Sequence, residues 1–72
     1  MAHSEVIRLR EQIERECEAM RLLSQGYAVA ASHAIIRRKY EQLGKYQEQL
    51  ASLVGEHEAM QTVVETYTKV VG

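Results

Sequence analysis

A regular spacing of apolar side chains in the second half of the chain constrains its fold more than any other feature. From Tyr46 onward, apolar and aromatic residues recur at steps that alternate strictly between four and three residues, and His57 is the one polar side chain among them. This alternation is the heptad spacing of a helix that packs against other helices. We call these heptad residues the seam: Tyr46, Leu50, Leu53, His57, Met60, Val64, Tyr67 and Val71.

The length of this pattern indicates association. Apolar spacing already begins at Ile36, and one helix from Ile36 to Val71 would be roughly 54 Å long, at about 1.5 Å per residue. A compact domain of 72 residues is narrower than that. We therefore expect a second copy or another protein to cover part of the seam, and the seam residues are the candidate interface.

Gly55 leaves two arrangements open. A glycine followed by Glu56 and Glu58 is typical of a helix end and the acid-rich first turn of a new helix. The heptad spacing, however, continues through Gly55 without a shift, which favours a continuous or merely kinked helix. The predicted fold class is all-α: an antiparallel helical hairpin with a long second arm, kinked or broken at Gly55, that associates into a helical bundle. The alternative is a monomeric three-helix bundle.

The composition favours helix throughout the chain. There is no proline and there are only four glycines, so the usual helix breakers are scarce. A first apolar stripe follows Ser4, a suitable N-cap, and ends before Gly26, which suits a helix C-terminus. We predict a single helical domain with helices over about 4–25 and 32–54 and a helical continuation over about 57–71.

Gly44 and the four tyrosines point to close or interfacial packing. Gly44 lies within the second helix, where glycine costs about 1 kcal/mol relative to alanine, and we interpret it as a close helix crossing. Tyrosine buries its ring while its hydroxyl stays in water, which suits the edge of a core or a partner surface. The tyrosines are Tyr27, Tyr40, Tyr46 and Tyr67.

The lone cysteine and the hydropathy pattern bear on the compartment. Cys17 is the only cysteine, so the chain has neither an internal disulfide nor a zinc-type cysteine pair. On an apolar helix face it is interpreted as a small buried hydrophobe, which suits a reducing cytoplasm. The longest apolar patch, residues 27–31, is too short to span a bilayer, and no signal-peptide pattern is present. We expect a cytoplasmic protein without membrane association.

Charge is distributed unevenly, although the net charge is only −1. Residues 33–46 carry four basic residues against one acidic one, and residues 47–72 carry four acidic residues against one basic one. Such patches could meet if two chains packed antiparallel. The candidate nucleic-acid contacts are Arg37, Arg38, Lys39 and Lys45. Consecutive residues spread around a helix, however, so a solvated, acid-pairing surface is the favoured interpretation.

The histidines give no metal motif. His3 lies at the start of the chain, and His33 and His57 are too far apart in sequence to form a ligand pair on one helix face. As a polar residue on the seam, His57 could instead fix the register of an oligomer in a pH-dependent manner. We find no phosphate-binding glycine loop and no nucleophile motif, and we expect no enzyme activity, metal or cofactor.

Three stretches of the chain resemble small, uncharacterised all-helical bacterial proteins. They are Leu23-Ser24-x-Gly26, His33-x-x-Ile36 with Arg38 nearby, and Leu50-x-x-Leu53-Val54-Gly55-Glu56-x-Glu58-Ala59. The resemblance covers the last two thirds of the chain. It implies a helical hairpin with a further C-terminal helical segment, and it implies no function.

Three functional hypotheses follow. The first is a non-enzymatic helical assembly or protein-interaction module that self-associates through the seam, as a dimer first and with a filament or an unidentified protein partner as variants. The second is a nucleic-acid-associated or regulatory accessory protein that uses the basic residues between Arg37 and Lys45. The third is a metal-binding bundle around His33, His57 and glutamates.

Overall fold

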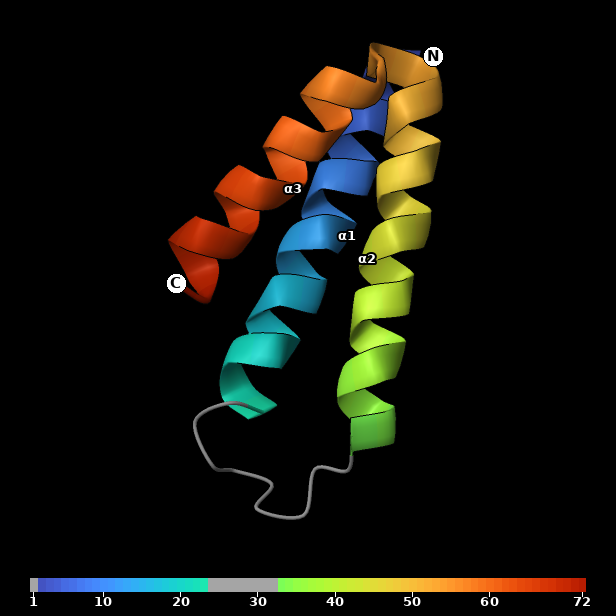
Figure 1. Cartoon of the computed structure of the whole chain (residues 1–72). Coiled ribbons are helices and arrows are strands. Elements are labelled where there is room, and N and C mark those ends of the chain that lie inside the picture. Colours follow the sequence, from blue (N-terminus) through green and yellow to red (C-terminus); the bar gives the residue numbers. More distant parts are fainter. Residues whose placement is uncertain (1, 24–32) are drawn as a thin grey trace.

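The computed structural model describes residues 2–23 and 33–72. Over these residues the chain forms three helices and no strand: α1 (Ala2–Leu22), α2 (His33–Val54) and α3 (Glu56–Val70). Figure 1 shows α1 and α2 side by side and antiparallel, with α3 running back along them from the C-terminal end of α2. Each helix packs against the other two. The predicted all-α class is confirmed.

Gly55 alone separates α2 from α3 and forms the corner between them. Its φ of 96° and ψ of 156° lie in a region that is essentially restricted to glycine. Its N–H donates to the carbonyl of Ala51 at 2.8 Å, and its own carbonyl accepts from the N–H of Ala59 at 3.0 Å. One residue therefore ends α2 and begins α3. The continuous or kinked helix that the heptad spacing favoured is wrong, because the chain breaks at Gly55 and α3 turns back onto α1 and α2.

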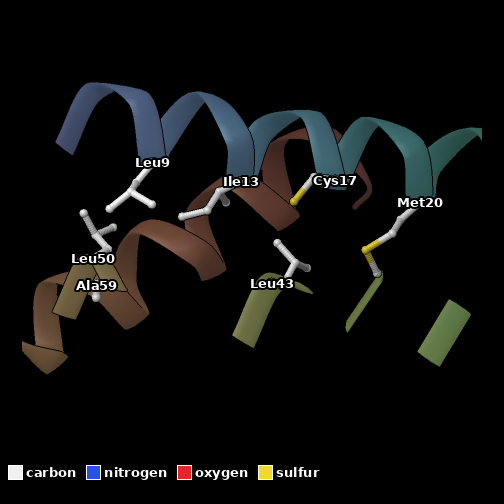
Figure 2. Close-up of a cluster of buried hydrophobic side chains, with 7 residues drawn as sticks. All are labelled: Leu9, Ile13, Cys17, Met20, Leu43, Leu50 and Ala59. Carbon is white, nitrogen blue, oxygen red and sulfur yellow. The ribbon is translucent and has the colours of Figure 1, made fainter. Parts of the chain in front are cut away.

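The core lies between the three helices. The apolar stripe of α1 faces the other two helices, and Figure 2 shows its side chains pointing toward them. Leu9 and Leu50 point toward one another, with Ala59 of α3 beside Leu50. Because Ala59 is small and fully buried, α3 can lie close to its neighbours. The buried residues are Leu9, Ile13, Cys17 and Met20 from α1, Leu43 and Leu50 from α2, and Ala59 from α3.

The third helix does not reach along the whole of α2. It has 15 residues, whereas α2 has 22, and it starts at the C-terminal end of α2. The side chain of Tyr67, near the end of α3, meets Tyr40 of α2. The first two turns of α2 therefore extend past α3, and Ile35 and Ile36 in those turns are 43% and 36% exposed.

Candidate interaction surface

The fold divides the seam between core and surface. Leu50 is fully buried, whereas His57, Met60 and Val64 are exposed. The remaining seam residues are half-buried: Tyr46, Leu53, Tyr67 and Val71. The structure therefore does not gather the eight predicted interface residues on one face, because the corner at Gly55 rotates α3 relative to α2.

The face of α3 that packs against the core is shifted by one residue along the sequence from the seam. Its members are spaced like seam residues, but each precedes one of them in the chain: Ala59, Val63, Thr66 and Val70 are buried or half-buried. The sequence carries a signal for this second face, since an apolar or β-branched residue stands directly before each seam position from Met60 onward. The prediction from the heptad spacing alone missed this core-facing side of α3.

An apolar groove runs between α2 and α3. We call it the outer groove; it has a volume of about 450 Å³ and is lined by Tyr40, Leu43, Gly44, Gln47, Val63, Val64, Tyr67 and Thr68. Gln47 also lines an adjoining hollow near the corner, together with His57 and Met60. Tyr40, Met60 and Val64 are each at least half exposed, at 51%, 50% and 57%. The most exposed seam residues thus border one surface with Tyr40.

Two tyrosines join the helices at one end of the outer groove. The hydroxyls of Tyr40 and Tyr67 lie 3.3 Å apart, and either can donate. This hydrogen bond is the main cause of a raised pKa of Tyr67, with smaller contributions from burial and from the nearby Tyr40 and Cys17. Both rings flank the groove, so the pair provides aromatic surface and a hydroxyl that reaches water.

Gly44 has open space around it in the described part of the chain. A Cβ built on Gly44 would meet nothing within 4 Å, so none of the described helices crosses α2 closely at this point. The close helix crossing that we predicted at Gly44 is therefore not formed within the described residues. The glycine instead lies open on the outer groove.

The basic cluster is split by the fold. Lys39 pairs with Glu16 across α2 and α1, with Nζ and Oε2 3.1 Å apart. Arg37, Arg38 and Lys45 are exposed. Because one of the four bases is already engaged with a carboxylate, the cluster presents less positive surface than its sequence indicates, and phosphate contact through it stays an untested hypothesis.

The remaining chemistry-bearing residues are dispersed. Cys17 is buried, and its pKa is raised by burial and by the nearby carboxylates of Glu16 and Glu14. His57 is exposed at the hollow near the corner. Within residues 2–23 and 33–72, no group of three or more histidines, cysteines or acids could hold a metal ion, and no helix is long and apolar enough to cross a membrane.

Comparisons with known proteins give no similar protein from which the outer groove could be interpreted. No family model matches the chain, and neither a curated protein nor a solved structure matches it significantly.

Proposed function

We propose that the chain is a non-enzymatic helical interaction module that self-associates through the outer groove as a two-fold dimer. The observation that supports this most is the contiguous exposure of Tyr40, Met60 and Val64 along α2 and α3. Grouped apolar exposure of this kind marks interaction surfaces more often than lone exposed residues do. Burying it would contribute about 25 cal/mol per Å² of apolar area.

Charge complementarity favours a second copy as the occupant. Arg37 lies two helical turns before Gly44, Glu48 lies one turn after it, and all three are exposed. If two α2 helices cross antiparallel near Gly44, Arg37 of each chain comes within about one turn of Glu48 of the partner subunit. A two-fold axis repeats this favourable pair, so the surface is complementary to itself.

Gly44 fits the same arrangement. A residue without a side chain lets two helix backbones approach closely, and the open space around Gly44 leaves that approach to another molecule. The two outer grooves would then face one another, so that α2 and α3 of both copies form a four-helix layer whose interior holds Tyr40, Met60 and Val64. The polar groups at its rim remain hydrated, as they do in most interfaces.

Sedimentation velocity with matched variants tests the proposal. Val64→Lys places a charge in the outer groove, and Ile7→Lys places the same charge on α1 at a residue that is also about half exposed. Between about 1 and about 100 µM, we expect the wild type and Ile7→Lys to approach twice the monomer mass and Val64→Lys to keep a clearly lower average mass, because it cannot pair through the outer groove. A monomeric wild type, or equal behaviour of the two variants, would contradict self-association through the outer groove.

A further inference from the structure

We propose a second mode of association that goes beyond the pairing of outer grooves: a domain-swapped dimer. In it, α2, Gly55 and α3 straighten into one helix, and α3 packs on α1 and α2 of the partner subunit. The hinge is Gly55, and three features of the chain support the exchange.

The first feature is the hydrogen bonding of the corner. The helical ladders of α2 and α3 already extend to the N–H and the carbonyl of Gly55, while the first turn of α3 has no side-chain cap. Straightening requires a change of backbone angles at one residue. It would pair three backbone N–H groups with three carbonyls that the corner leaves without helical partners. The N–H groups belong to Glu56, His57 and Glu58, and the carbonyls to Ser52, Leu53 and Val54.

The second feature is the presence of two apolar faces on α3. The face that begins at Ala59 packs into the core. The seam face is exposed at Met60 and Val64 and half-buried at Tyr67 and Val71. The seam spacing runs unbroken through Gly55. The sequence periodicity therefore suits one straight helix from α2 into α3, which the closed bundle does not form. In either form the Ala59 face can make the same contacts with an α1–α2 pair.

The third feature is the direction of the core-facing residues in a straight helix. Ala59 follows Leu43 by 16 residues, so at about 100° per residue the two side chains would point roughly 160° apart. When α2 covers its own α1, the core face of a straightened α3 therefore points away from that α1. Only a partner subunit can then bury it, which makes straightening and dimerisation one event.

The composition of α3 makes its packing indispensable. Residues 62–71 contain seven threonines and valines, and β-branched residues have low helix propensity. A detached α3 would not remain helical by itself. The exchange therefore conserves the core contacts and adds hydrogen bonds at the hinge, while it costs the entropy of association. We expect the swapped form to become populated as protein concentration rises.

Two enantiomeric residues at position 55 provide the test. An L-alanine disfavours the closed corner, because positive φ with extended ψ is strained for L residues, and it favours a straight helix. A D-alanine accepts the corner and disfavours the right-handed helix. A Cβ built on Gly55 in the L configuration meets no atom within 4 Å, so the Gly55→Ala variant acts through backbone preference. Chemical synthesis of the 72-residue chain gives both variants.

The readout is the distance between spin labels at Glu41→Cys and Thr68→Cys in a Cys17→Ala background, with labelled chains diluted in unlabelled chains. Both positions are exposed. Thr68 lines the outer groove, and Glu41 adjoins Tyr40, which lines it too, so the closed bundle gives a short distance. A straight helix separates the positions, 27 residues apart, by about 40 Å. Pairing of outer grooves doubles the mass but leaves the distance within one chain short, so the two modes are distinguishable.

In the wild type, which has glycine at position 55, we expect the fraction of molecules with the long distance to rise with concentration. The particle mass should double as that fraction rises. Gly55→Ala should raise the fraction of molecules with the long distance at least about fivefold, given the helix propensities of alanine and glycine. D-alanine at position 55 should abolish the long distance. A short distance at every concentration in both the glycine protein and Gly55→Ala would overturn the proposal. A long distance in particles of monomer mass would also overturn it.

Discussion

The hydroxyl of Tyr40 on α2 lies 3.3 Å from the hydroxyl of Tyr67 on α3. This contact joins residues that are 27 positions apart and marks where the C-terminal half of α3 meets α2. It exists only because the chain turns back at Gly55, since a straight helix would place the two rings about 40 Å apart. The same contact defines one end of the outer groove.

The tyrosine pair predicts how stability changes at alkaline pH. The pKa of Tyr67 is raised from its ordinary value of 10.0, chiefly by the hydrogen bond with Tyr40. A raised pKa in the folded state means that the protonated form favours folding. The stabilisation is complete below pH 10 and is lost as pH rises through the folded-state pKa. Because the hydrogen bond between the two hydroxyls is exposed to solvent, we expect Tyr67→Phe to lower the free energy of unfolding at pH 8 by no more than about 0.5 kcal/mol.

Urea unfolding of the wild type and Tyr67→Phe at pH 8 and pH 11 measures this effect. Cys17 also has a raised pKa and destabilises both proteins at high pH, so only their difference reports on Tyr67. We expect that difference to shrink at pH 11. A difference that grows with pH would show that the tyrosinate, and not the tyrosine, is favoured in the folded state.

Neighbouring residues Ala59 and Met60 distinguish the observed face of α3 from the seam face. Ala59 is fully buried and Met60 is 50% exposed. We expect Ala59→Met to destabilise the fold by about 1–3 kcal/mol through overpacking. Met60→Ala should change the free energy of unfolding of the monomer by less than about 0.5 kcal/mol.

Chemical denaturation of the two variants at low concentration, where association is weak, gives both values. If the seam faced the core, the order would reverse, because truncation of a buried methionine to alanine costs about 2–5 kcal/mol. A larger loss from Met60→Ala than from Ala59→Met would therefore contradict the rotation of α3 that the corner at Gly55 produces.

Substitution of Gly44 by alanine should change the stability of the monomer and its self-association in opposite directions. Because a Cβ at this position meets nothing within 4 Å, Gly44→Ala should stabilise the monomer by about 0.5–1 kcal/mol through helix propensity. The same methyl group would hold two crossing helices apart, so we expect weaker self-association. Thermal unfolding at low concentration and sedimentation equilibrium at high concentration measure the two effects, and tighter association of the variant would exclude a close crossing at Gly44.

The sequence predicted the helices of this fold better than their connection. The absence of proline and the apolar stripes were sufficient for an all-helical chain, because local propensity and periodicity agree there. The sequence left the break at Gly55 open, because a glycine followed by Glu56 and Glu58 indicates a helix end whereas the heptad spacing passes through it without a shift. Tertiary packing decided the outcome, because α3 covers the apolar face of α1 only if the chain turns back. The periodicity within one segment gives no information about a face on another helix.

The surface residues were predictable only in part. Met60 and Val64 were identified as interface candidates from the seam, and both are exposed, but Leu50 of the same seam is in the core. Tyr40 was recognised as suited to an edge, whereas its position beside Tyr67 depends on the corner. The pairing of Lys39 with Glu16 joins two helices and could not be read from the spacing within either one.

Disulfide trapping at position 44 tests self-association through the outer groove most directly. In an antiparallel crossing near Gly44, the two copies of Gly44→Cys lie close to the two-fold axis. The added side chain weakens the pairing as in Gly44→Ala, but a disulfide traps each encounter that brings the Cα atoms within the separation of about 4.4–6.8 Å that it requires. Lys45→Cys, on an exposed neighbour that points about 100° away, is the control. Under mild oxidation we expect rapid cross-linking of Gly44→Cys into a covalent dimer and little cross-linking of Lys45→Cys. Equal rates for the two variants, or no covalent dimer of Gly44→Cys, would contradict pairing through this surface.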